Sequence, residues 1–147
     1  MRQPVLLYPP EIAGGFIADQ EGFSGLAYKC PAGVWTIGFG HTKNVREGDA
    51  VTRSEAFQML FEDLVDVQED LAALVKVPVT ENQFIALMSF VYNFGISKCR
   101  QYTLFKMINA GDKAGVKEWW PKYCSPGTVF EKGLKARRLR ELELFFS

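Results

Sequence analysis

Residues 80–95 read TENQFIALMSFVYNFG and predict the central helix of the fold. Thr80 and Gln83 have the spacing of a capping box, in which each side chain bonds the backbone N–H of the other residue. The residues that follow are almost all apolar, which is typical of a helix buried on all sides. Gly95 supplies the stop. We therefore expect a helical core around this segment.

A second capping box, at residues 52–55, opens a long amphipathic helix that stops before Pro78. The acidic residues of its exposed face are Glu62, Asp63, Asp66, Glu69 and Asp70. A solvated face explains them well, and we attach no function to them. Shorter helices are predicted at about residues 10–21, 100–110, 113–120 and 134–146, next to glycines or prolines that bound them.

Residues 22–50 differ from the rest because they are rich in glycine, aromatic and β-branched residues. Between Leu26 and Thr42 we expect a β-hairpin whose turn is Pro31-Ala32-Gly33. The predicted fold is therefore α+β and two-lobed, with a small β-hairpin lobe joined by a long helix to a mainly helical lobe. We expect a single domain over residues 1–147, with a β lobe at about 22–50, a helical lobe at about 76–147, and residues 1–21 near the latter.

The charges of the chain sum to zero but are unevenly placed. Residues 1–95 hold 6 Lys and Arg against 12 Asp and Glu, whereas residues 96–147 hold 11 against 5. Two solvated faces explain this division, and attraction of the basic half to an anionic polymer is the functional alternative. Nucleic acid is a poor candidate for that polymer because no DNA-binding or RNA-binding motif is present. The N-terminal residues predict neither a signal peptide nor a stable membrane insertion.

The cysteines and the single histidine give no metal-binding pattern. Cys30, Cys99 and Cys124 lack CxxC spacing, and His41 stands apart from them. We therefore expect neither a metal nor a cofactor. An odd number of cysteines suits a reducing cytosol, with a Cys99–Cys124 disulfide as the alternative to free thiols.

Three side chains can meet around one cleft: Glu21 at a helix end, and Cys30 and Thr36 in the two arms of the hairpin. Hydrolysis of a glycosidic bond needs a protonated acid at the leaving oxygen and a second group that activates water or stabilises the cationic sugar. Glu21 is a candidate for the acid. On these residues alone, such a glutamate is more often a surface residue of a helix.

The segment EGFSGLAYKCPAGVWTIGFGHT, residues 21–42, resembles the active-site signature of the bacteriophage lysozyme (endolysin) family. That signature is Glu, eight residues, Asp or Cys, five residues and Thr, and it falls on Glu21, Cys30 and Thr36. Further similarity lies in residues 36–41, 80–87, 93–95 and 133–145, so it spans most of the chain. The resemblance implies a peptidoglycan hydrolase that cuts the β-1,4 bond from N-acetylmuramic acid to N-acetylglucosamine.

By the same resemblance, Glu21 is the general acid, Cys30 is the second catalytic group, and Thr36 helps to hold the attacking water. A thiol with an ordinary pKa near 8.5 is only about 3% ionised at pH 7, so Cys30 carries less charge than an aspartate. The alternatives are a buried small hydrophobe for Cys30 and an ordinary strand residue for Thr36.

The resemblance also implies substrate contacts at Tyr92 and Asn93. Gly40 is a candidate for close backbone approach to a sugar, with tight packing of strands as the alternative. Core packing of Tyr92 and a helix cap at Asn93 are the alternatives. For His41 we expect a structural role, in which its ring bonds a neighbouring carboxylate or backbone group.

The resemblance implies a phage or prophage enzyme that acts on peptidoglycan strands as a monomer. Because no export signal is evident, we expect it in the host cytoplasm until a holin releases it to the periplasm or cell wall. Two alternatives stay open: a peptidoglycan-binding protein without catalysis, since the second carboxylate is missing, and a lytic transglycosylase that cuts the same bond.

Overall fold

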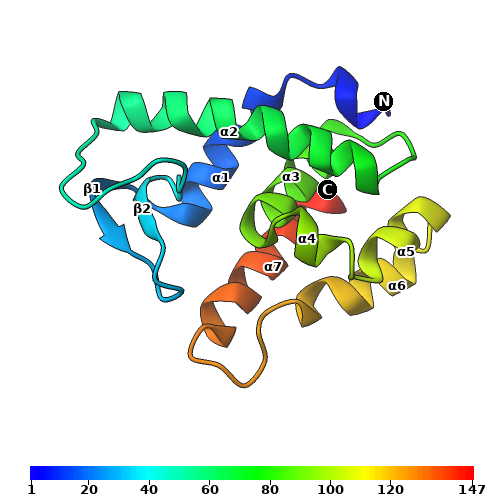
Figure 1. The fold of residues 1–147 in the computed structure, drawn as a ribbon. Helices are drawn as coiled ribbons and strands as arrows, with labels where there is room; N and C mark the ends of the chain where they lie inside the picture. Colours follow the sequence, from blue (N-terminus) through cyan, green and yellow to red (C-terminus); the bar gives the residue numbers. More distant parts are fainter. The chain divides into compact units, whose positions relative to one another are not determined.

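In the computed structural model, residues 1–147 are all described and form two compact units. We call Pro10–Asp66 the hairpin unit, and Met1–Pro9 with Val67–Ser147 the helical unit. One two-stranded sheet and seven α-helices confirm the predicted α+β class (Figure 1). None of the helices combines the length and the apolar character that crossing a membrane requires.

The hairpin unit begins with a 3-10 helix, η2 (Pro10–Ala13), which continues into α1 (Gly14–Glu21). We expected one uninterrupted helix here, but helix starts often take this tighter form. Residues 10–21 group with the hairpin unit. One reason is close packing against α2 (Arg53–Leu74), since a Cβ on Gly14 would lie 2.7 Å from the Phe61 ring.

Strands β1 (Ser24–Lys29) and β2 (Trp35–Gly38) pair antiparallel, with Tyr28 opposite Thr36. The turn between them is the predicted one, because the Gly33 N–H donates to the Cys30 carbonyl at 2.8 Å. β2 ends earlier than expected, at Gly38. This residue has a φ of 65°, and a Cβ there would lie 3.0 Å from the Cβ of Ala56, so only glycine fits without strain.

The helical unit is built around α3 (Glu81–Phe94), most of which is buried, as the sequence predicted. Both capping boxes form: Thr80 with Gln83 before α3, and Thr52 with Glu55 before α2. The remaining helices of this unit are η1 (Val5–Leu7), α4 (Ile96–Cys99), α5 (Leu104–Ala110), α6 (Lys113–Trp119), η3 (Trp120–Lys122) and α7 (Glu131–Phe145). Helix α7 packs along α3 (Figure 1).

The helices of this unit differ from the predicted ones at several points. Helix α5 starts at Leu104, although the predicted helix started at about residue 100. Helix α4 was not expected. Pro121 does not end the helical path but lies inside η3, where proline fits the first turn because its missing N–H is not needed there. Helix α7 starts at Glu131 and includes Gly133, which we had placed before it.

The first residues of the chain are tied to the helical unit through backbone groups. Gln3 and Val79 exchange two backbone hydrogen bonds of 2.9 Å. The Tyr8 hydroxyl donates to the Val79 carbonyl at 2.8 Å, and the Tyr8 ring stacks on Phe84. The buried Gln68 amide donates to the carbonyls of Val5 and Tyr8. Contacts between residues far apart in sequence therefore hold this unit together.

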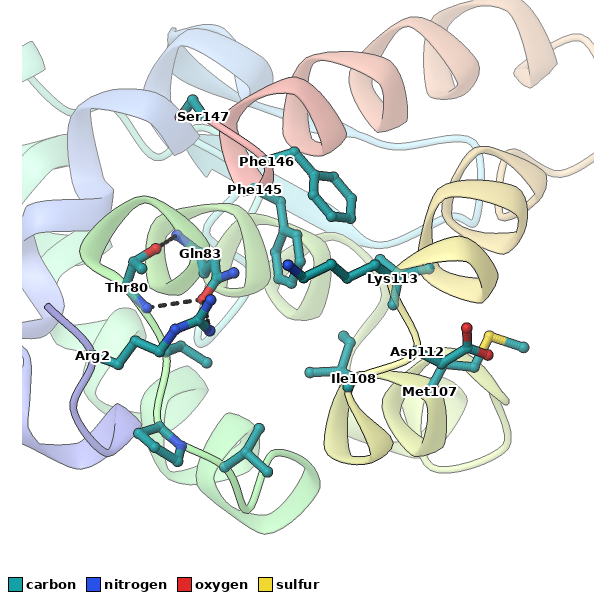
Figure 2. Close-up of a pocket in the computed structure, with 15 residues that line it drawn as sticks. Arg2, Thr80, Gln83, Met107, Ile108, Asp112, Lys113, Phe145, Phe146 and Ser147 are labelled. Atoms are coloured by element: carbon teal, nitrogen blue, oxygen red, sulfur yellow. Dashed lines mark hydrogen bonds between the residues drawn. The ribbon is translucent and has the colours of Figure 1, made fainter.

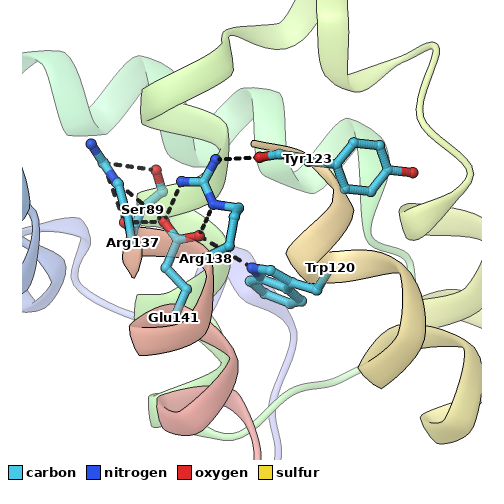
Figure 3. A network of polar contacts seen from close by, with 6 residues as sticks. All are labelled: Ser89, Trp120, Tyr123, Arg137, Arg138 and Glu141. Carbon is cyan, nitrogen blue, oxygen red and sulfur yellow. Dashed lines mark hydrogen bonds and ion pairs between the residues drawn. The ribbon is translucent and has the colours of Figure 1, made fainter. Parts of the chain in front are cut away.

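A buried polar network crosses the core of the helical unit (Figure 3). The fully buried Glu141 carboxylate accepts hydrogen bonds from Ser89, Trp120, Arg137 and Arg138. Arg138 is also fully buried, and its guanidinium lies over the rings of Phe90 and Phe94 at 4.9 and 4.6 Å. Every charge in this network therefore meets a partner, as buried charges must.

Candidate active site

Glu21 is the last residue of α1, and its side chain is half-buried. The helix ends there because Gly22 takes a φ of 72° and donates its N–H to the Ala18 carbonyl. The predicted place of Glu21 at a helix end is thus confirmed. Only Gly22 and Phe23 separate Glu21 from the start of β1.

Cys30 directly follows β1 and is held by the turn. Its backbone N–H donates to the Val34 carbonyl at 2.9 Å, and its thiol is half-buried. The pKa of this thiol is lowered mainly by the backbone N–H of Val34. The N–H of Ala32 and the hydroxyl of Thr36 contribute less, and partial burial acts in the opposite direction. The turn therefore surrounds the sulfur with donors that favour the thiolate.

Thr36 lies on β2 and is buried. Its hydroxyl donates to the Val34 carbonyl at 3.0 Å, and it also contributes to the lowered pKa of Cys30. Because a hydroxyl carries one proton, it can serve only one of these two acceptors at a time. Thr36 and Cys30 are therefore neighbours in the structure.

Tyr28 joins this group, although it was not among the predicted site residues. It faces Thr36 across the sheet and precedes Cys30 by two residues, which is the spacing of side chains on one strand face. The pKa of its hydroxyl is raised by burial and, to a lesser degree, by the negative charges of Glu21 and Cys30. Tyr28 thus lies within electrostatic range of both groups. The i, i+2 spacing was the signal that could have identified it.

His41 follows Gly40 in the loop after β2 and has the structural role predicted for it. Its Nδ1 lies 2.7 Å from the Asp63 carboxylate, and its Nε2 lies 3.0 Å from the Lys43 carbonyl. Asp63 is therefore not a solvated residue of α2, as the sequence suggested, but fixes this loop. No group of three His, Cys, Asp or Glu side chains is arranged to hold a metal ion.

Tyr92 and Asn93 belong to the helical unit, near the end of α3, and are half-buried. The side-chain oxygen of Asn93 is buried without a hydrogen-bond partner. Such an atom is rare in native proteins and is consistent with a ligand contact. The roles of Gly40, Tyr92 and Asn93 in substrate binding stay predictions.

Comparison with known proteins places these features in a family. The phage lysozyme family matches residues 18–141. An endolysin of Acyrthosiphon pisum secondary endosymbiont phage 1 is 38% identical over 89% of this chain and 92% of its own. A SAR-endolysin of Enterobacteria phage P21 is 36% identical over 84% of this chain and 76% of its own.

Solved structures agree. The muramidase domain of SpmX from Asticaccaulis excentricus matches with a TM-score of 0.85 and 33% identity, over 92% of this chain and 95% of that domain. The endolysin of Escherichia coli O157:H7 phage FAHEc1 matches with a TM-score of 0.79 and 34% identity, over 100% and 97% of the two chains.

The fold is that of a lysozyme-like glycosidase. The chain belongs to the phage lysozyme family. Its activity is accordingly that of a muramidase-type endolysin, which hydrolyses peptidoglycan and acts on the bacterial cell wall.

Proposed function

We propose that Glu21 donates a proton to the leaving oxygen of the β-1,4 bond between N-acetylmuramic acid and N-acetylglucosamine. Cys30 and Thr36 hold the water that attacks the anomeric carbon. The observation that carries this assignment is the hairpin itself, which brings Cys30 beside Thr36 and surrounds the thiol with backbone donors. The electrostatic coupling of Tyr28 to both Glu21 and Cys30 supports a shared site.

In this reaction the glycosidic carbon–oxygen bond breaks as the water oxygen bonds to the anomeric carbon. The proton of Glu21 goes to the departing sugar oxygen, while Cys30 accepts a hydrogen bond from the water. The water then releases one proton to the solvent, and Glu21 regains a proton from the solvent for the next cycle. A lowered thiol pKa increases the negative charge available at the sulfur near neutral pH. Cys30 therefore performs with a polarised thiol the work for which an aspartate would use a full charge.

The test is digestion of purified sacculi by the wild type and by Glu21→Gln. Loss of the proton donor lowers the rate of hydrolysis by about 10²-fold to 10⁴-fold. The matched control is Glu11→Gln, which changes an exposed glutamate of the same unit and keeps the wild-type rate. Full activity of Glu21→Gln with an intact circular dichroism spectrum would refute the assignment.

Cys30 is tested in the same assay. Cys30→Asp keeps most of the activity, and Cys30→Ser keeps a measurable part, because both substituents can hold a water. Complete inactivity of a folded Cys30→Ser protein contradicts water positioning as the role. Mass spectrometry of the products separates the reactions, since hydrolysis leaves reducing ends and a lytic transglycosylase leaves 1,6-anhydromuramic ends.

We further propose that the enzyme acts as a monomer and is held in the host cytoplasm until a holin lets it reach the wall. The basic residues 96–147 then assist its binding to the anionic envelope. Envelope binding that is equal at low and high salt argues against this electrostatic contribution.

A further inference from the structure

A hollow of about 220 Å³ lies within the helical unit, apart from the residues of the hairpin site (Figure 2). The start of α3, the end of α5, the start of α6 and the last residues of the chain form its walls. The proposed hydrolysis assigns no role to it.

The inner wall of this hollow is apolar. Its buried residues are Val79, Ile108, Val116 and Phe145. An ordered water needs two to four polar partners, and this wall supplies none from its side chains. The surface therefore favours an apolar group.

Two cationic side chains face each other across the hollow, Arg2 from one side and Lys113 from the other (Figure 2). The Arg2 guanidinium donates one hydrogen bond, to the Gln83 side-chain oxygen at 3.2 Å, and so keeps further donors unused. The Lys113 ammonium forms no hydrogen bond or ion pair. Two like charges thus share one opening without an anion between them.

The nearby carboxylates do not neutralise this pair. Asp112 caps α6 by accepting the Gly115 N–H at 2.9 Å, and in Figure 2 its carboxylate lies beside Met107, away from both cations. The terminal carboxylate of Ser147 forms no ion pair with Arg2 or Lys113.

We propose that the hollow binds a small organic carboxylate with a short apolar chain. The chain packs on the wall formed by Val79, Ile108 and Phe145, and the carboxylate lies between Arg2 and Lys113. The volume limits the ligand: it exceeds the roughly 150 Å³ cavity that holds benzene in an engineered core but is below the roughly 300 Å³ at which drug-sized sites begin.

The test is a titration of the ¹⁵N-labelled full chain with hexanoate, followed through its backbone amide signals. We expect saturable shifts at Thr80, Gln83, Lys113 and Val116, which line the hollow. 1-Hexanol tests the need for charge, and acetate tests the need for the chain. Each should bind at least about tenfold more weakly than hexanoate.

Substitution of the two cationic residues tests whether they bind the carboxylate. Arg2→Gln combined with Lys113→Gln weakens hexanoate binding at least about tenfold. The control Lys106→Gln removes an exposed lysine of α5 that does not line the hollow, and it leaves binding unchanged. Met107→Trp keeps both charges but fills part of the space, so it also weakens binding.

The absence of shifts at the lining amides up to about 20 mM hexanoate overturns the proposal. Equal binding of 1-hexanol, or unchanged binding by the double variant, overturns it as well. Hexanoate binding is also measured with Glu21→Gln, which loses hydrolysis of sacculi but keeps wild-type binding of hexanoate, so the hollow and the hairpin site are tested separately.

Discussion

Cys30 and Cys99 are the same side chain in two environments. Cys30 sits in the turn of the hairpin unit, half-buried and surrounded by backbone donors that lower its pKa. Cys99 ends α4 in the helical unit and is fully buried, and burial raises its pKa to about 12 in spite of the opposing charge of Arg138. Backbone donors without full burial make a thiol ionisable, whereas burial makes it an inert packing group.

The largest expected difference is in alkylation. With iodoacetamide at pH 7, native Cys99 should react at least about a thousandfold more slowly than Cys30, because far less of it is thiolate. Mass spectrometry of tryptic peptides measures both rates in one sample. Protein unfolded in urea is the control, and there both cysteines react alike. Equal alkylation rates of Cys30 and Cys99 in the native protein would contradict the difference in pKa between the two thiols.

The next effect concerns the charges around Cys99. Arg138→Met should lower the free energy of unfolding by about 3–5 kcal/mol, because Glu141 keeps its buried charge but loses its closest cation. Urea denaturation measures the change. Lys135→Met, at an exposed position of the same helix, should change stability by less than about 0.5 kcal/mol. A loss below about 1 kcal/mol in Arg138→Met contradicts a structural role for this pair.

Alkaline pH gives a third test. Between the ordinary thiol pKa near 8.5 and about 12, Cys99 ionises in the unfolded chain but not in the folded one. Its contribution to stability therefore falls as the pH rises, by up to about 1.4 kcal/mol per pH unit. The difference in unfolding free energy between the wild type and Cys99→Ala isolates this slope from other titrating groups. A difference that is constant from pH 8 to 10 contradicts it.

The smallest effect is expected at Thr36. Thr36→Val removes a hydroxyl that helps to lower the pKa of Cys30, so the pH midpoint of Cys30 alkylation should move upward. The shift is modest because the Val34 N–H contributes more. The control Thr42→Val, at an exposed position in the same unit, leaves the midpoint in place. A downward shift would mean that the hydroxyl does not stabilise the thiolate.

Local sequence rules predicted the parts of the molecule that local interactions determine. The capping boxes at Thr52 and Thr80, the end of α1 at Gly22 and the Pro31-Ala32-Gly33 turn depend on residues within a few positions of one another. The positions of Glu21, Cys30 and Thr36 were predicted from the family resemblance. The structure adds the donors around Cys30, which no spacing rule predicts.

Contacts between residues far apart in sequence were not predicted. Helical periodicity places Asp63 on the polar face of α2, but it cannot show that the loop after β2 brings His41 to that carboxylate. Likewise, the charged residues of α7 read as surface residues, although Arg138 and Glu141 are fully buried. In both cases a partner that the fold brings close compensates the charge. The composition of the segment does not identify that partner.

The bonds of Gln3, Tyr8 and Gln68 have a consequence for the order of folding. The hairpin unit is one continuous stretch of chain, so all the residues that make its contacts are present once residue 66 has been synthesised. The helical unit is interrupted by that stretch, and its first nine residues have to wait for Val79 and Phe84. Prior folding of the hairpin unit shortens the loop that must then be closed and reduces its entropic penalty. During synthesis on the ribosome, early folding of residues 10–66 thus makes it easier for residues 1–9 to reach the rest of the helical unit.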